Sequence, residues 1–263
     1  MNFEIKQADK FKFIEEGEGE PLILLHGLFG ALSNFSDLVN YFRHHNKVVV
    51  PMLPLLDLDL LHTSVGGLQK FVHKFIEHRN YQNVHLLGNS LGGHVAILHV
   101  LKQPERIKSL ILTGSSGLFE NGMGDTYPKR GDYDYIKKKT ELTFYDPRVA
   151  SKELVDEVYE TVNNRLKAIK IIALAKSAIR NNLGEELNQI KQPTLLVWGP
   201  TMPRAKASWV RNHKSQAMAN VSISLPNAVI KRPVSSSRKS RCRSAAYGSW
   251  CGVFCDDIFT CSL

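Results

Sequence analysis

Residues 84–93 read Val-His-Leu-Leu-Gly-Asn-Ser-Leu-Gly-Gly, and this stretch decides the fold more than any other part of the chain. An apolar run suited to a buried strand leads into Gly-x-Ser-x-Gly, and apolar residues at helical spacing follow at once. This order predicts a sharp strand-to-helix turn with Ser90 at its apex, where glycines leave room for neighbouring backbone. We predict that Ser90 is a catalytic nucleophile. The alternative is a glycine-rich turn with only a structural role.

A second glycine-bearing loop follows the apolar run at residues 21–25 and reads His-Gly-Leu-Phe-Gly over residues 26–30. With both motifs present, residues 1–199 resemble the α/β-hydrolase superfamily. The resemblance implies an oxyanion hole formed by the backbone N–H groups of Leu28 and Leu91, with Phe29 as the fallback for Leu28. It also implies that His26 holds its loop in place and is not the catalytic base.

Strand-like and helical patterns alternate along the chain, which predicts an α/β fold with a doubly wound, mostly parallel sheet and helices on both faces. The resemblance implies the α/β-hydrolase fold with a helical cap. The alternating segments 3–6 and 11–14 predict a strand hairpin. Further patterns predict a strand at 47–53, a helix at 64–80, and strands at 108–114 and 194–199.

The same patterns divide the chain into four parts. We predict that residues 1–117 form the N-terminal part of the hydrolase core and that residues 188–199 contribute a further core strand. Residues 118–187 have helical patterns and no strand pattern, so the resemblance implies a cap inserted over the substrate site. The alternative is a helical bundle that extends the core. Residues 200–263 form an atypical tail.

The tail carries most of the chain's unusual composition. The net charge is +9, but residues 199–263 hold ten of the basic residues and two of the acidic ones, which leaves the remainder at +1. All four cysteines also lie in this part. The overall basic charge is therefore not evidence for a nucleic-acid partner. We interpret the tail as disordered or frameshift-derived sequence, with the last strand and helix of the fold missing or replaced.

The triad partners of Ser90 are missing from their expected places. In the superfamily an acid follows the strand that ends here near Gly199, but no acid occurs for 56 residues after it. His213 is the only histidine beyond His99 and is the candidate base, and Glu120 or Asp125 are substitute acids. We therefore expect this exact chain to be inactive or crippled as a hydrolase.

The function predicted for this chain is that of a serine hydrolase acting on small, mostly apolar esters through an acyl-enzyme. One alternative is a C–C bond hydrolase of ring-fission products, whose cap arginine is replaced here by Val158. Another is a non-catalytic scaffold. We expect a small-molecule substrate, no cofactor, no metal, no nucleic-acid partner and no membrane partner. Strand-length apolar runs and the absence of a signal-peptide pattern predict a cytoplasmic protein. The oligomeric state is left open.

Overall fold

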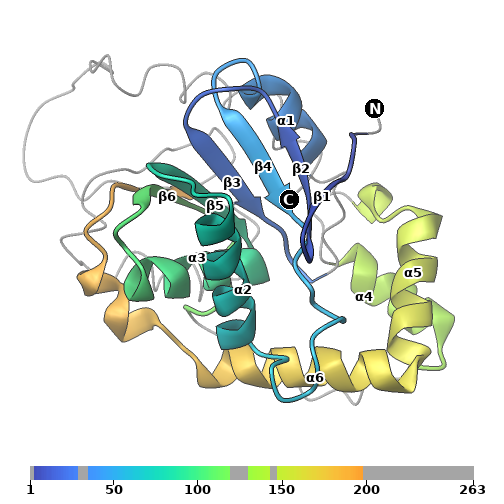
Figure 1. The fold of residues 1–263 in the computed structure, drawn as a ribbon. Coiled ribbons are helices and arrows are strands. Elements are labelled where there is room, and N and C mark those ends of the chain that lie inside the picture. Colours follow the sequence, from blue (N-terminus) through green and yellow to red (C-terminus); the bar gives the residue numbers. More distant parts are fainter. Residues whose placement is uncertain (1–2, 29–34, 119–129, 143–146, 198–263) are drawn as a thin grey trace, which may run out of the picture.

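The computed structural model describes residues 3–28, 35–118, 130–142 and 147–197, and structural statements below refer to these residues. Their strands form one seven-stranded sheet in the order β1-β2-β4-β3-β5-β6-β7 (Figure 1). The strands are β1 (Lys6–Ala8), β2 (Phe11–Glu16), β3 (Pro21–Leu25), β4 (Lys47–Pro51), β5 (Val84–Asn89), β6 (Ile107–Thr113) and β7 (Thr194–Val197).

The α-helices are α1 (Ser36–Phe42), α2 (Val65–His78), α3 (Leu91–Lys102), α4 (Tyr133–Glu141), α5 (Lys152–Asn163) and α6 (Arg165–Arg180). Short 3-10 helices cover Pro147–Val149 and Gly184–Gln189. Several helices begin at side-chain caps, because a Ser, Asp or Asn oxygen accepts the N–H three residues on. These caps are Ser64, Asp132, Ser151 and Asn164.

Five adjacent strands of the sheet, β4, β3, β5, β6 and β7, are parallel, and the chain reaches each one by crossing over. The antiparallel pairs lie at the N-terminal edge, where β1 pairs with β2 and β2 pairs with β4. The predicted hairpin is therefore confirmed, although its first strand begins at Lys6, further along the chain than the alternating pattern indicated.

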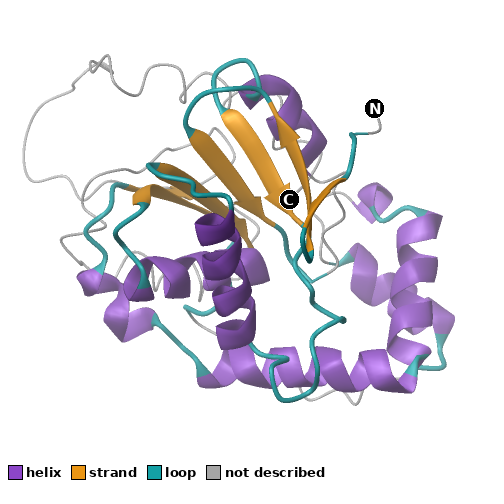
Figure 2. Cartoon of the chain, viewed as in Figure 1, coloured by secondary structure: helices purple, strands orange, loops and turns teal. Residues whose placement is uncertain are grey.

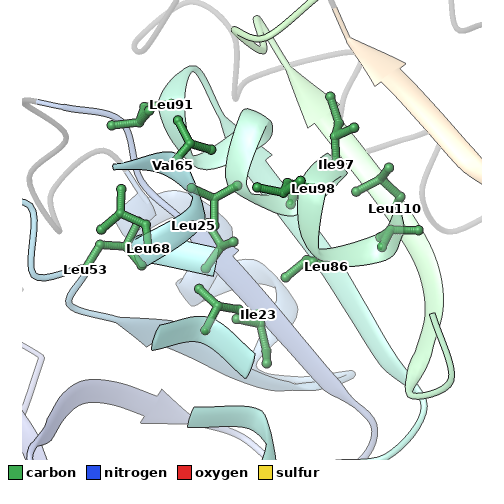
Figure 3. Close-up of a cluster of buried hydrophobic side chains, with 14 of the residues drawn as sticks. Ile23, Leu25, Leu53, Val65, Leu68, Leu86, Leu91, Ile97, Leu98 and Leu110 are labelled. Atoms are coloured by element: carbon green, nitrogen blue, oxygen red, sulfur yellow. The ribbon is translucent and has the colours of Figure 1, made fainter. Parts of the chain in front are cut away.

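Helices cover both faces of this sheet, which confirms the predicted doubly wound arrangement (Figure 2). Alternate residues of β3 point to opposite faces, as strand geometry requires. Ile23 and Leu25 pack in the cluster with α2 and α3, which Figure 3 shows, whereas Leu22 and Leu24 pack in the cluster with α1.

Helices α4 to α6 lie between β6 and β7 in the chain and form a layer beside the sheet (Figure 1). Their contacts bury a small set of side chains that belongs to neither sheet cluster: Ile136, Val155, Val158 and Ala168. The second half of α6 is different, because Leu174 and Ala178 are part of the cluster with α2 and α3. One helix thus joins the inserted layer to the core.

Truncating Leu174 tests whether α6 belongs to the core. Leu174 is 1% exposed and Ile172, on the same helix, is 38% exposed. We expect Leu174→Ala to lower the free energy of unfolding by about 2–5 kcal/mol, because truncating a buried leucine leaves a cavity. Ile172→Ala should change it by less than about 0.5 kcal/mol, as surface substitutions usually do. Urea unfolding measures both, and equal effects would show that α6 is not packed as described.

Candidate active site

The candidate site lies where two loops leave neighbouring strands. β3 and β5 are parallel partners, with Leu25 opposite Gly88, so their carboxyl ends lie side by side. The helix after β3 covers one face of the sheet and the helix after β5 covers the other. In open α/β sheets, ligands bind in the crevice that forms where the connections after two adjacent strands cover opposite faces of the sheet. The two motifs found in the sequence therefore meet at the position that this topology favours for a site.

Ser90 stands at the junction of β5 and α3 in an uncommon backbone conformation. Its φ is 52° and its ψ is −117°, outside the regions that a side chain ordinarily prefers. Such a conformation costs about 1–3 kcal/mol and persists only where the surroundings enforce it. The residue is exposed, although every residue from Leu91 to Val100 is buried. The turn therefore presents the serine to solvent, as the sequence motif predicts.

Hydrogen bonds from β6 and the loop after it hold this conformation. The Ser90 N–H donates to the Thr113 carbonyl at 3.1 Å. The Ser90 carbonyl accepts from the N–H of Ser116 at 3.0 Å, from the hydroxyl of Ser116 at 3.2 Å and from the N–H of His94 at 3.2 Å. Ser116 is thus a positioning residue that the sequence motifs did not reveal.

Glycines allow the elbow to pack directly on the two strands. A Cβ added at Gly92 would lie 2.0 Å from the Leu25 carbonyl oxygen, and one at Gly88 would lie 2.5 Å from the Gly92 carbonyl oxygen. Both obstacles are backbone atoms, which cannot turn aside as a side chain can. Gly27 is nearly as close to the nucleophile, since its added Cβ would lie 3.2 Å from the Ser90 Cβ. The loop after β3 therefore lies against Ser90.

The amide groups predicted for the oxyanion hole flank this contact. Leu91 is the first residue of α3, where N–H groups have no acceptor within the helix and carry the positive end of its dipole. Leu28 follows Gly27 directly and is partly buried against the core. Phe29 lies outside the described residues. The arrangement of the two loops suits stabilisation of an oxyanion, and the roles of Leu28 and Leu91 remain predictions.

Backbone groups occupy both ring nitrogens of His26. Nδ1 lies 2.9 Å from the Gly27 carbonyl oxygen, which can only accept, and Nε2 lies 3.1 Å from the Leu53 N–H, which can only donate. These partners assign the proton to Nδ1 of a neutral ring. Burial lowers the pKa of His26, which also favours the neutral form. His26 ties the loop after β3 to the chain beyond β4, in agreement with the role that the resemblance implies.

Other histidines near the sheet have partners of their own. On α3, Nε2 of His94 donates to the Asn181 carbonyl at 2.7 Å, and the His99 ring lies against Gln69. His85 contacts Ser109 and Glu20 at the amino ends of the strands, the edge opposite Ser90. None of these contacts is a bond to the Ser90 hydroxyl. The candidate triad residues His213, Glu120 and Asp125 lie outside the described residues.

Polar contacts tie α6 to the elbow helix. Besides accepting from His94, Asn181 donates through Nδ2 to the Ser177 carbonyl at 2.6 Å. The Ser177 hydroxyl in turn accepts the Val65 N–H at the start of α2, at 3.1 Å. The sequence gives no local signal of this contact, because His94 and Asn181 are 87 residues apart. The inserted layer is therefore connected directly to the helix that begins at the candidate nucleophile.

Within the described ranges of the chain, no group of three or more His, Cys, Asp or Glu side chains is arranged to hold a metal ion. No helix within the same ranges has the length and apolar character needed to cross a membrane.

The sheet, the elbow at Ser90 and the adjoining His-Gly loop are those of the α/β-hydrolase fold. Residues 20–143 match the family model described as the alpha/beta hydrolase fold. A solved α/β hydrolase enzyme from the metagenome of Mar Chica lagoon sediments in Morocco is 40% identical, with a TM-score of 0.63 over 79% of this chain and 82% of that one. The chain belongs to the α/β-hydrolase family.

Named relatives in this family are more distant. Lipase 1 of Psychrobacter immobilis is 25% identical over 74% of this chain and 67% of its own length. The 2-hydroxy-6-oxo-6-phenylhexa-2,4-dienoate hydrolase of Comamonas testosteroni is 24% identical over 70% of this chain and 72% of its own. The relatives therefore include both enzyme classes that the sequence suggested, and they support a hydrolase without deciding its substrate.

Replacing Gly92 tests the close approach of α3 to β3. We expect Gly92→Ala to lower the free energy of unfolding by about 3 kcal/mol or more, because the added methyl group meets the Leu25 carbonyl. Gly66→Ala is the matched control in α2, where the nearest heavy atom to the added Cβ is a Ser64 oxygen at 3.9 Å. The control should be neutral or stabilising by up to about 1 kcal/mol. Equal urea midpoints for the two variants would contradict the packing.

His99 gives a pH test of the α3 environment. Burial, followed by the nearby His73, lowers the pKa of His99 to about 4. The unfolded chain, with an ordinary histidine pKa, therefore binds an extra proton between about pH 6.5 and pH 4. The contribution of His99 to the free energy of unfolding is fully present above pH 6.5. It falls by about 3 kcal/mol in all as the pH drops through that window.

The measurement is the difference in stability between the native chain and His99→Gln at several pH values. The native chain should lose more stability than the variant between pH 6.5 and pH 4, because only its side chain takes up the proton on unfolding. The matched comparison is His78→Gln on α2. Parallel curves for the native chain and His99→Gln would contradict the burial of a neutral ring.

Proposed function

We propose that this chain is a serine hydrolase that cleaves small, mostly apolar esters, with Ser90 as the nucleophile. The observation that carries the proposal is the conformation of Ser90, which is exposed at a positive φ where the loops after β3 and β5 meet. A strained residue enforced by its surroundings is typical of a functional position. The lipase among the relatives supports ester cleavage by this class of site.

In the proposed reaction the Ser90 hydroxyl attacks the ester carbonyl, and its proton passes to a base. The N–H groups of Leu28 and Leu91 stabilise the negative charge on the former carbonyl oxygen. The intermediate then expels the alcohol, which takes up the proton, and leaves an acyl group on Ser90. Water attacks this acyl-enzyme in the same way and releases the acid. His213 remains the candidate for the base, and Glu120 and Asp125 remain the candidates for the acid that orients it.

The inserted helices α4 to α6 are proposed as a cap that selects the substrate. The cap is favoured over an extension of the core, since α4 and α5 bury side chains in a set of their own. An ester is favoured over a C–C bond substrate because Val158, at the position of the missing arginine, is 7% exposed and offers no charge to a carboxylate. The C–C hydrolase among the relatives keeps that second reaction as the alternative.

Removing the Ser90 hydroxyl tests the proposal. Without a base in its usual place, the chain should hydrolyse p-nitrophenyl acetate only slowly, through unassisted attack by the Ser90 hydroxyl, above a background on the order of 10³–10⁴ over water that the oxyanion hole and binding supply alone. Ser90→Ala should lower the rate to that background and should lose the acetyl group that the ester leaves on Ser90, which mass spectrometry of the intact chain detects. Ser109→Ala, on β6 at the opposite edge of the sheet, should leave the rate unchanged.

Two outcomes would contradict parts of this proposal. Equal rates for Ser90→Ala and the native chain would remove Ser90 as the nucleophile. Ordinary enzymatic turnover by the native chain, abolished in Ser90→Ala, would show that the tail does supply a base, and His213→Ala would then be the next variant. Reading the nucleotide sequence around codon 199 in all three frames checks the same point, because we expect another frame to encode an Asp-bearing loop and a Gly-His turn.

A further inference from the structure

Helix α6 presents large apolar side chains to solvent. Leu166 is 55% exposed, Ile169 is 42% exposed and Ile172 is 38% exposed, and Ile179 continues the series toward the end of the helix. Residues in a helix are separated by about 100° of rotation, so these four positions fall on one side of it. The opposite side carries Leu174 and Ala178 into the core. The helix is therefore apolar on an outward-facing side as well as on its buried side.

The same side of α6 is strongly basic. Residues 165–180 contain five Lys or Arg residues and no acidic residue, whereas residues 1–198 as a whole have a net charge of +1. Arg165, Lys176 and Arg180 are exposed and lie at intervals of eleven and four residues, on the side that Ile169 occupies. Three of the five cations of the helix thus lie among the exposed apolar side chains.

A loop with exposed leucines runs along one flank of the helix. The Lys170 ammonium donates to the Leu56 carbonyl at 2.6 Å, and the Ser177 hydroxyl accepts the Val65 N–H at 3.1 Å. The segment between Leu56 and Val65 therefore runs along α6, as Figure 1 also shows. It includes Leu60, which is 48% exposed, and Leu61, which is 93% exposed.

The loop also carries acidic groups near this surface. Asp57 and Asp59 lie in the same segment, and Asp59 is paired with His62 at 2.8 Å. We call the combined surface the α6 face. It comprises Leu60, Leu61, Leu166, Ile169, Ile172 and Ile179 with Arg165, Lys176 and Arg180.

We propose that the α6 face docks on the surface of an anionic lipid bilayer. Apolar side chains ringed by Lys and Arg are the composition with which a helix lies in the membrane interface, where the chains enter the acyl boundary and the cations meet acidic head groups. A second copy of the chain is a poorer partner, because two basic faces would repel each other. A nucleic acid would leave the exposed leucines and isoleucines without an apolar environment.

This inference changes the expectation of no membrane partner, because a helix that lies on a bilayer need not span it. It does not depend on the reactivity of Ser90. It bears on the proposed function, because α6 is joined through Asn181 and His94 to the helix that begins at Ser90. Docking would place the proposed cap against the phase in which apolar esters concentrate.

The test measures binding of the intact chain to vesicles of phosphatidylglycerol and, separately, of phosphatidylcholine by flotation. We expect binding to phosphatidylglycerol vesicles, weakening as NaCl is raised, and much less binding to phosphatidylcholine. Ile169→Glu should lower the partition coefficient at least tenfold, because it removes an apolar side chain from the acyl boundary and adds one negative charge at an anionic surface. Ile5→Glu is the control, since Ile5 is 50% exposed on the β1 side of the sheet.

A second pair of variants separates charge from apolar contact. Lys176→Glu on the α6 face should weaken binding about tenfold, and Lys74→Glu, exposed on α2, should not. These pairs also distinguish the α6 face from the basic residues beyond Gly199, which lie outside the described residues and carry the same charge in every variant. Ser90→Ala should bind as the native chain does, so docking and catalysis can fail separately.

Several results would overturn the proposal. Binding that survives both Ile169→Glu and Lys176→Glu would assign the membrane contact to another surface. Absence of binding to phosphatidylglycerol vesicles would contradict the proposal altogether. Light scattering that shows a dimer dissociated by Ile169→Glu would identify the α6 face as an interface between copies. Tighter binding to duplex DNA than to these vesicles would identify a nucleic-acid surface instead.

Discussion

The structure depends on the close approach of the start of helix α3 to β3 and β5, where the glycines leave no side chain between the backbones. Gly92 faces the Leu25 carbonyl and Gly88 faces the turn of the helix, so both positions exclude a Cβ. This close approach fixes where the helix begins and forces Ser90 into a positive φ at its start. It also places the first amides of α3 beside the loop that contains Gly27. The geometry of the candidate site thus follows from a packing constraint on the backbone.

The inserted helices are linked to that constraint. α6 contributes Leu174 to the core, and its Ser177 and Asn181 bind groups on α2 and α3. A change in the position of α6 would therefore reach the elbow through a short set of hydrogen bonds. The outward side of the same helix is the basic, apolar surface proposed to dock on lipid. Substrate selection and membrane contact would then involve one element of the fold.

Much of the fold and part of the site could be predicted from the sequence, because the signals are local. Glycine spacing predicts the elbow at Ser90, and an apolar run predicts the strand at Pro21–Leu25. The contact of His94 with Asn181 could not be foreseen, since its partners are 87 residues apart and meet only through tertiary packing. β1 was misplaced because its residues are mostly exposed and lack a buried pattern.

We infer that the backbone conformation of Ser90 makes this serine more reactive than the other serines of the chain. The direct measurement is labelling of the intact chain with a fluorophosphonate, followed by peptide mapping with mass spectrometry. Amides that stabilise an oxyanion also stabilise the negative oxygen of the phosphonyl transition state, so Ser90 should be modified first, well before Ser116 or Ser109. Modification spread evenly over exposed serines, or confined to a serine other than Ser90, would contradict the claim.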